Sequence, residues 1–364
     1  MLRFLFLLLT LLLPAPAVAD DWTACIAQPA PDFFYVADKG RKLLFQMEER
    51  GGQPAAMRQF GCIHGRVEGD KQKEGDLKTP EGVYFITRKI TQKLDFMEYG
   101  PHAVSLNYPN PADRLRGKTG SGIWLHSKGQ PIAGLTTRGC LAIDQHEIRE
   151  IVHQLKPGTP VIVAEHLAGL PFYGRDSNAL PIGAPEPAAV EKTSPAAELP
   201  QGKTAVFGKI NKEKNDGQTK QDEGAQLSAC VHAVDFPIAP APAYCDVQTV
   251  DAPKVLELAR RWIEHREART EGIFEFYDAT AWAKASRESF SRKQKRLRGQ
   301  FQNQKDFTID RKSLNVLYGP GYWVTSFTES YRLKDGQHRG RRALYWMKDT
   351  TGTYRIIGEI RIAQ

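Results

Sequence analysis

A long stretch without hydrophobic periodicity divides this sequence, and it restricts the chain to folding as two separate ordered parts. From about Leu170 to Val247 the sequence is dominated by Pro, Ala, Glu and polar residues, as in PIGAPEPAAVEKTSPAAELPQGK and KINKEKNDGQTKQDEGAQ. Such segments bury too little apolar surface to offset the entropy lost on ordering them. We therefore predict a linker over residues 169–248 between two domains, at residues 30–168 and 249–364.

The part before the linker carries the pattern of a mostly β domain with few helices. Two short strands joined by a Lys-Gly turn are expected in FFYVADKGRKLLFQME, and further strands in GVYFITRKI, GIWLH and PVIVAEH. Gly and Pro stand at almost every junction between them. One helix is predicted after Asp144, which forms a capping-box pattern with Glu147, and it is expected to end at the following Lys-Pro-Gly sequence.

The part after the linker begins with helical patterns and ends with long strand patterns. The stretch APKVLELARRWIEHREA is amphipathic, with Val255, Leu258, Ala259 and Trp262 on one face. A second helical stretch is predicted near residues 279–302, and strands are predicted in YWVTSFTESYRL, RRALYWMKD and TYRIIGEIRI. This order predicts an α+β domain in which helices pack on a curved antiparallel sheet.

The first residues have the features of a secretory signal peptide. Arg3 precedes a run of Leu and Phe, and Ala17-Val18-Ala19 matches the small-residue cleavage pattern. An uncleaved membrane anchor is the alternative interpretation. No later segment approaches the roughly 20 apolar residues needed to span a bilayer. We expect residues 1–19 to be removed and the mature protein, without a membrane span, to be periplasmic or exported to the cell envelope.

The number of cysteines is odd, which in an oxidising compartment leaves one thiol unpaired and open to a reactive role. Cys25 with Cys62 and Cys230 with Cys245 are possible disulfide pairs, but the sequence alone establishes neither bond. The fifth cysteine is Cys140.

The positive charge is concentrated in the last third of the chain. The net charge is +8, and from Asp251 onward there are 23 basic and 14 acidic residues. The densest basic run is SRKQKRLRG, which includes Arg292, Lys293, Lys295 and Arg296. A solvated helix face is the ordinary interpretation, and attraction to an anionic envelope polymer or to substrate carboxylates is the functional one. If recruitment of such a polymer is the only role of this part, the function of the first domain should survive its removal. Nucleic acid is not an expected partner of an exported protein.

The stretch GIWLHSKGQPIAGLTTRGCLAI contains the residue types needed for nucleophilic acyl transfer. A cysteine attacks as a thiolate, and a neighbouring histidine can take the thiol proton and return it to the leaving group. Cys140 and His126 fit these roles. Gly139 permits a tight turn whose N–H groups can face an oxyanion, and Arg138 can favour a thiolate or hold a carboxylate. From the residues alone, a small buried cysteine and a satisfied strand-end histidine remain alternatives.

Several motifs together resemble the L,D-transpeptidase catalytic domain of bacterial cell-wall enzymes. His126 followed by Thr137-Arg138-Gly139-Cys140 resembles the family's His-Gly pair and its Ser/Thr-His-Gly-Cys motif. GDLKTPEGVYFI resembles its Thr-Pro-x-Gly strand entry, YPNPADRLRGKTGSGIWLH its Tyr-Pro-Asn and apolar-His run, and FYVADKGRKLLFQM its opening hairpin. The resemblance covers about residues 31–164. It implies that Cys140 is the nucleophile and His126 its acid/base partner, with Thr137, Arg138 and Gly139 at oxyanion and substrate-binding positions.

The sequence also departs from the family pattern around the site. Ser127 stands in place of the usual Gly, Arg138 in place of the usual His, and Ala142 in place of a frequent Arg, and the loop after His126 is short. The C-terminal part resembles an NTF2-like domain. The two together resemble the D,L-carboxypeptidases that set cell shape in curved bacteria, whose Ser-Arg-Gly-Cys type of motif the Cys140 stretch approaches. These departures leave the nucleophile and base in place but put the substrate and acceptor in doubt.

The resemblance implies a peptidoglycan-modifying cysteine enzyme acting on stem peptides. We expect an L,D-transpeptidase that passes the acyl group from Cys140 to an amine. An L,D- or D,L-carboxypeptidase with water as acceptor is the alternative, and a non-catalytic cell-wall binding module is a third possibility. The mechanism needs no cofactor. No metal site is expected, because His64, His102 and His146 lack ligand spacing with Asp, Glu or Cys.

Overall fold

The computed structural model describes residues 23–24, 26–51, 53–167 and 248–363. The predicted signal peptide, residues 1–19, lies outside the described residues, and so does the predicted linker except for its last residue, Gln248. All described residues belong to one unit of the chain. Within these ranges, no helix combines the length and the apolar character needed to cross a membrane.

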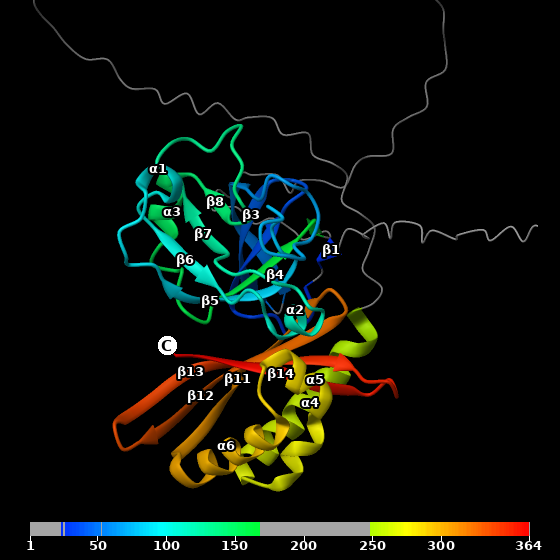
Figure 1. Cartoon of the computed structure of the whole chain (residues 1–364). Coiled ribbons are helices and arrows are strands. Elements are labelled where there is room, and N and C mark those ends of the chain that lie inside the picture. The colour runs from blue at the N-terminus through cyan, green and yellow to red at the C-terminus, as the bar shows by residue number, and fades with distance from the viewer. Residues whose placement is uncertain (1–22, 25, 52, 168–247, 364) are drawn as a thin grey trace, which may run out of the picture. The chain divides into compact units, whose positions relative to one another are not determined.

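The N-terminal domain is a closed barrel of eight strands, which confirms the predicted mostly β fold (Figure 1). The strand order around the barrel is β2-β3-β4-β8-β7-β6-β5-β9. Most neighbours are antiparallel, but β2 pairs with β9 and β7 pairs with β8 in parallel. The strands are β2 (Phe33–Asp38), β3 (Leu43–Arg50), β4 (Gln53–Ile63), β5 (Gly82–Lys89), β6 (Ala103–Leu106), β7 (Trp124–Ser127), β8 (Leu141–Ile143) and β9 (Pro160–Ala164).

Short elements complete this domain. The pair β1 (Thr23–Ala24) and β10 (His166–Leu167) is parallel, and the helices are α1 (Phe96–Tyr99), α2 (Pro111–Leu115) and α3 (Gln145–Ile151). As predicted, α3 begins after Asp144, and Asp144 and Glu147 form a reciprocal capping box. The helix ends at Ile151, earlier than the sequence pattern indicated.

Three barrel strands bury both of their faces. Alternate residues of β2, β5 and β9, such as Tyr35, Tyr84 and Val161, pack inside the barrel. The residues between them belong to a second apolar cluster that extends into the C-terminal domain. Because neither face meets water, these strands have continuous apolar sequences instead of an alternating pattern.

The C-terminal domain has helices first and long strands afterwards, which confirms the predicted α+β order (Figure 1). Its four strands form an antiparallel sheet in the order β11-β12-β13-β14. The single helical stretch predicted near residues 279–302 is two helices, separated at Arg287 by a left-handed backbone conformation. The elements are α4 (Gln248–Ala268), the 3-10 helix η1 (Glu271–Phe276), α5 (Ala279–Ser286), α6 (Phe290–Asn303), β11 (Lys305–Gly319), β12 (Tyr322–Leu333), β13 (Gly336–Lys348) and β14 (Tyr354–Ala363).

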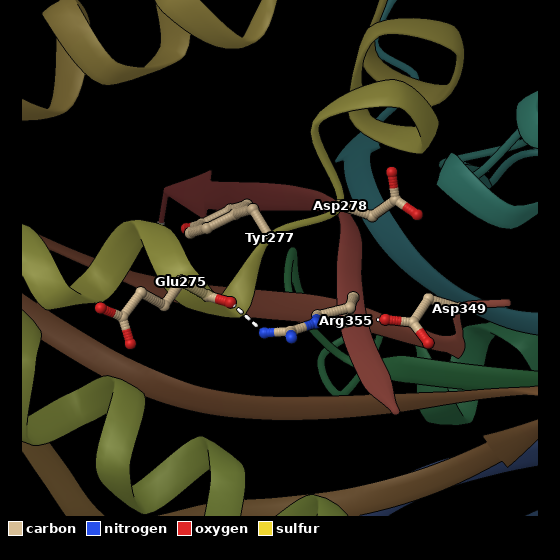
Figure 2. Close-up of a pocket in the computed structure, with 5 residues that line it drawn as sticks. All are labelled: Glu275, Tyr277, Asp278, Asp349 and Arg355. Atoms are coloured by element: carbon tan, nitrogen blue, oxygen red, sulfur yellow. Dashed lines mark hydrogen bonds and ion pairs between the residues drawn. The ribbon is translucent and has the colours of Figure 1, made fainter. Parts of the chain in front are cut away.

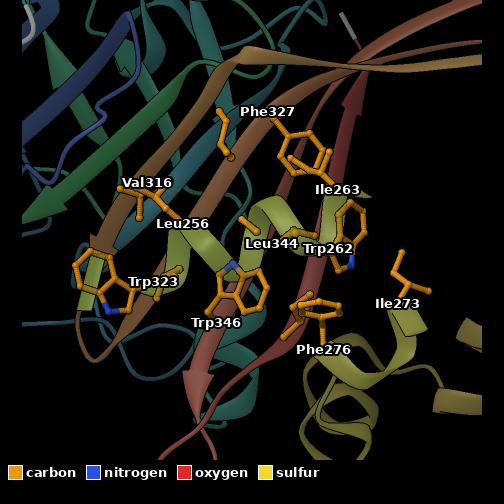
Figure 3. Packing of buried hydrophobic residues seen from close by; sticks show 14 of the residues in the cluster. Leu256, Trp262, Ile263, Ile273, Phe276, Val316, Trp323, Phe327, Leu344 and Trp346 are labelled. Atoms are coloured by element: carbon orange, nitrogen blue, oxygen red, sulfur yellow. The ribbon is translucent and has the colours of Figure 1, made fainter. Parts of the chain in front are cut away.

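One face of this sheet packs against the helices. Figure 3 shows Trp262 of α4 and Phe276 of η1 close to Phe327, Leu344 and Trp346 of the sheet. Val255 and Ala259, predicted to lie on the apolar face of α4 with Trp262, belong to the same cluster. The amphipathic pattern therefore identified the buried face of α4 correctly.

The other face of the sheet packs against the barrel. Val324, Tyr345 and Ile357 form one cluster with Val83 and other residues of the barrel strands. The sheet is therefore covered on both faces, and the two domains share an apolar core.

The basic run on α6 is less exposed than its sequence indicated. Lys293 is buried and forms an ion pair with Glu359. Two arginines of the run pair with exposed or half-buried carboxylates, Arg296 with Glu288 and Arg298 with Glu271. Within the described structure, Arg292 and Lys295 are the basic side chains of this run without an ion pair. The expected cationic surface therefore does not include Lys293.

The shared core predicts that the C-terminal domain cannot be removed without damage. Deleting the residues from Asp251 onward would expose the barrel side of this core. Each large apolar side chain that loses its burial costs about 1.5–3 kcal/mol, and small domains have only about 5–15 kcal/mol of stability in total. We expect the fragment to aggregate or to melt well below the full chain, as measured by soluble yield and thermal denaturation. A soluble, monomeric fragment with an unchanged melting temperature would contradict this.

Candidate active site

The parallel pairing of β7 and β8 brings the two predicted catalytic residues onto adjacent strands. His126 is in β7 and pairs with Ala142, while Leu125 pairs with Leu141. Cys140 immediately precedes β8, so continuing the register places it opposite Trp124. Residues two apart on a strand point to the same side of the sheet. Cys140 and His126 are therefore diagonal neighbours on one side of the sheet.

The turn before Cys140 is held by the Thr137 hydroxyl. The Gly139 N–H donates to Thr137 Oγ1 over 3.0 Å, and the same hydroxyl donates to the Cys140 carbonyl over 2.7 Å. Thr137 is itself buried, and its N–H donates to the His64 carbonyl. Thr137 therefore shapes the turn, and the Gly139 N–H is occupied within it. Both groups are therefore used within the turn itself, and their contact with an oxyanion or a substrate stays a prediction.

A glycine is required at position 139. Its φ is +129°, and a Cβ atom there would lie 2.7 Å from the carbonyl oxygen of Lys78. The Thr79 hydroxyl donates to the Gly139 carbonyl over 3.0 Å and accepts from the Gly65 N–H over 2.8 Å. Thr79 of the Thr-Pro-x-Gly motif thus holds the turn that precedes Cys140, a contact that the sequence did not reveal.

Arg138 is the predicted substrate-binding residue that the structure leaves open to solvent. Its side chain is exposed and makes no hydrogen bond or ion pair with any described residue. It follows the Thr137 turn and lies two residues before Cys140. A guanidinium at this place is available to a carboxylate of a bound peptide.

His126 is arranged to accept a proton through Nε2. The side chain is only 1% exposed. Its Nδ1 lies 2.5 Å from the Ser127 carbonyl oxygen, which can only accept a hydrogen bond, so Nδ1 carries the proton. No hydrogen bond within the described residues uses Nε2. Burial lowers the pKa of His126 to about 4, so the imidazole is neutral at pH 7.

Cys140 is partly exposed and is held as a thiol. Its Sγ donates to the Gly122 carbonyl over 3.5 Å. Burial raises the pKa of the thiol, and a hydrogen bond from the Trp124 backbone partly opposes this effect. A raised cysteine pKa and a lowered histidine pKa favour a neutral thiol–imidazole pair over a thiolate–imidazolium pair. The proton therefore resides on the sulfur of Cys140, and His126 Nε2 is unprotonated.

Tyr99, from α1, is a site residue without a sequence signal. Its ring centroid lies 5.2 Å from that of His126 and 5.3 Å from that of Trp124. The segment that carries it is anchored to the end of β7 by an ion pair of 2.9 Å between Lys128 and Glu98. Phe96 and Met97 of α1 are large apolar side chains that remain about half exposed. The α1 segment therefore places an aromatic ring against His126 and exposes two large apolar side chains nearby in the sequence.

Ser127 occupies the place of the usual Gly without displacing His126. Its hydroxyl is buried and has no hydrogen-bond partner among the residues that the structure describes. It fits because residue 100 is Gly, where a Cβ atom would lie 2.1 Å from Ser127 Oγ. Gly100, at the end of α1, thus leaves the space that the Ser127 side chain needs.

The remaining cysteines and histidines do not form a second centre in the described structure. Cys62 carries a free, buried thiol in the described part of the chain. Cys25, Cys230 and Cys245 lie outside the described residues. Within the described ranges, no group of three or more His, Cys, Asp or Glu side chains is placed to hold a metal ion.

A shallow polar pocket lies in the C-terminal domain and serves structural purposes. Its volume is about 420 Å³, and its lining residues are Glu275, Tyr277, Asp278, Asp349 and Arg355 (Figure 2). Asp278 caps α5, and Asp349 accepts hydrogen bonds from the turn between β13 and β14. Arg355 connects Asp349 to the Glu275 carbonyl. The polar groups of this pocket are thus largely occupied by the fold itself.

Comparisons with known proteins identify a family that part of this chain resembles. Residues 32–163 match the family model of the L,D-transpeptidase catalytic domain, YkuD. The putative L,D-transpeptidase YafK of Escherichia coli K12 is 35% identical over 90 residues, which are 25% of this chain and 33% of that protein. The chain thus matches about one third of the length of this curated relative.

Two solved structures resemble nearly the whole chain. Bd1075 of Bdellovibrio bacteriovorus is 18% identical, with 94% of this chain and 97% of that chain covered at a TM-score of 0.53. The helical cell shape determining protein Pgp2 of Campylobacter jejuni is 19% identical, with 94% and 96% covered at a TM-score of 0.48. The likeness to Bd1075 shows that the barrel and the C-terminal sheet occur together in one known fold.

Proposed function

Because residues 32–163 belong to the L,D-transpeptidase catalytic-domain family, we propose that this protein is a peptidoglycan-modifying cysteine enzyme of the cell envelope. The observation that carries the proposal is the arrangement of a partly exposed thiol, Cys140, diagonal to a buried neutral imidazole, His126. The proposed site is open on the side of Arg138, where a peptide carboxylate can bind.

The geometry supports a two-step acyl transfer. Cys140 Sγ attacks the carbonyl of the third residue of a stem peptide while its proton moves to His126 Nε2. The tetrahedral intermediate collapses, the bond to the terminal D-amino acid breaks, and His126 returns the proton to the departing amine. The product is a thioester on Cys140. An acceptor then loses a proton to His126, attacks the thioester and releases the thiol.

Candidate substrate contacts surround this pair. The exposed guanidinium of Arg138 is proposed to bind the carboxylate of the leaving D-amino acid, since charge-assisted hydrogen bonds to carboxylates are strong. Tyr99 and Trp124 are proposed to line the peptide. The Thr137 hydroxyl and the Gly139 N–H are proposed to hold the turn, because both are bonded to each other.

We propose an amine as the first acceptor, which makes the enzyme an L,D-transpeptidase. Hydrolysis, giving an L,D- or D,L-carboxypeptidase, is favoured by one specific feature. Arg138 replaces the usual His, as in the Ser-Arg-Gly-Cys type of motif of shape-determining carboxypeptidases. The C-terminal domain is proposed to be NTF2-like and to bind a ligand or, through Arg292 and Lys295, an anionic cell-wall polymer. The proposed location is the periplasm, after removal of a signal peptide at residues 1–19.

Mass spectrometry of purified muropeptides incubated with the mature protein tests the function. Loss of the terminal D-amino acid alone identifies a carboxypeptidase. Exchange of that residue for an added D-amino acid, or formation of cross-linked dimers, identifies a transpeptidase. A carbapenem mass adduct on Cys140 supports either enzyme. If muropeptides stay unchanged and no adduct forms, the protein is a binding module and the proposal is wrong.

The two pKa shifts predict the pH dependence of the reaction. Burial lowers the pKa of His126 to about 4, so the base is deprotonated above that pH and is lost as the pH falls through it. We expect kcat/KM, which reports the free enzyme, to stay high well below the ordinary histidine pKa of about 6.5. The alkylation rate of Cys140 should increase at a higher pH than the rate of an ordinary thiol, because burial raises the pKa of Cys140. An acidic limb centred near the ordinary histidine pKa would contradict the neutral pair.

A further inference from the structure

The first residues of β5 lack a neighbouring strand on one side. Pairing between β5 and β6 begins at Ile86, whereas Val83 pairs only with Ile162 of β9. The backbone groups of Val83 are satisfied by side chains instead. Its N–H donates to the Tyr322 hydroxyl over 2.8 Å, and its carbonyl accepts from Asn110 Nδ2 over 3.1 Å. A tyrosine of the C-terminal domain thus replaces part of a missing strand.

The barrel is shaped to receive this hydroxyl. Asn110 Nδ2 also donates to it over 3.0 Å, and Tyr322 is only 1% exposed. Gly82 has a φ of +148°, and a Cβ atom there would lie 2.6 Å from the Tyr322 oxygen. The glycine of the Thr-Pro-x-Gly motif therefore allows the close approach of Tyr322.

The same short segment supports the nucleophile turn at its other end. Thr79, four residues before Val83, donates to the Gly139 carbonyl over 3.0 Å. Between them, the Glu81 N–H donates to Asp70 over 2.9 Å, and the Glu81 carboxylate pairs with Lys39 over 2.7 Å. Residues 79–83 therefore form a braced strip that connects Tyr322 to the residue preceding Cys140.

We propose that Tyr322 is a positioning residue for the Cys140 turn. Its hydroxyl fixes the Val83 end of the strip, and Thr79 at the other end fixes the Gly139 carbonyl. The C-terminal domain then takes part in setting the geometry of the thiol, in addition to any binding of its own. This inference rests on the proposed role of Cys140 as nucleophile.

A matched pair of hydroxyl deletions tests the proposal. Tyr345 is also fully buried in the interface, and its ring lies 5.9 Å from that of Tyr322. Among the described residues, its hydroxyl accepts one hydrogen bond, from the Asn107 side chain over 3.1 Å. Tyr322→Phe should lower kcat on soluble muropeptides and the alkylation rate of Cys140 about tenfold with little change in KM, because small misplacements of reacting groups slow reactions strongly. Tyr345→Phe should lose similar stability but change these rates less than about twofold.

Thr79→Val removes the hydroxyl at the other end of the strip while keeping the size of the side chain. If Tyr322 acts through the strip, the double variant with Tyr322→Phe should be slowed clearly less than the product of the two single effects. The proposal would be overturned if the double variant were slowed by the full product of the two single effects. Equal alkylation rates for Tyr322→Phe and Tyr345→Phe would also overturn it. The alkylation rates decide this even if the wild-type protein leaves muropeptides unchanged, in which case the proposed function alone fails.

Discussion

Replacement of Cys140 by alanine is expected to abolish turnover of stem peptides while leaving the barrel folded. The thiol makes only weak hydrogen bonds within the described residues, to the Gly122 carbonyl and from the Trp124 backbone, so its removal costs little stability. Without sulfur no thioester can form. Cys140→Ser should be almost as inactive, because a hydroxyl beside a neutral imidazole lacks the reactivity of the thiol. Muropeptide turnover, the carbapenem adduct and thermal denaturation measure these effects.

Cys62→Ala is the matched control for this experiment. Cys62 is the other free cysteine among the described residues, and burial raises the pKa of its thiol to about 12. It is therefore unreactive at neutral pH, and its replacement should preserve turnover and the adduct on Cys140. The variant should be less stable than wild type, because a buried side chain is shortened. Turnover by Cys140→Ala at the parent rate would show that the nucleophile assignment is wrong.

Replacement of His126 by alanine is expected to lower turnover by about 10²- to 10⁴-fold, the usual contribution of a positioned acid/base. The loss should appear mainly in kcat, because the imidazole acts on protons and not on substrate affinity. Alkylation of Cys140 at neutral pH should also slow. The acidic limb of the pH profile near pH 4, assigned to this imidazole, should disappear from the residual activity.

His64→Ala is the matched control for His126→Ala, because the two histidines have the same local hydrogen bond. It is buried, its Nδ1 lies 3.1 Å from the Gly65 carbonyl oxygen, and burial lowers its pKa. His126 has the same type of bond to its own neighbour, Ser127. His64→Ala should therefore lose comparable stability with much less loss of kcat. Equal losses of activity in the two variants would mean that His126 is structural.

Local patterns in the sequence were sufficient to predict several features of the fold. Five strands of the barrel (β2, β3, β5, β7 and β9), the capping box at Asp144 and the apolar face of α4 depend on residues a few positions apart, and these were predicted. The barrel strands β4, β6 and β8 were not predicted. The pair of Cys140 and His126 was also selected from its motif. Candidate nucleophiles and bases can be recognised in a sequence because few residue types have the required reactivity.

Other features depended on contacts between distant parts of the chain. Lys293 looked like part of a cationic surface, but its ion pair with Glu359 is inside the helix–sheet core. Tyr99 comes to His126 from a loop with no motif. Thr137 and Gly139 looked like substrate contacts, yet they bond to each other because the turn closes on itself.

The sequence by itself was sufficient to predict a mostly β part followed by an α+β part, and to propose Cys140 and His126 as nucleophile and base. Only the tertiary structure decided that the domains share a core and that Tyr322 reaches Val83, 239 residues away in the chain. The physical reason is that periodicity records whether a residue is buried but not what it is buried against. An apolar run such as VYFI indicates a strand covered on both faces, and the partner that covers it is chosen only when the chain is folded.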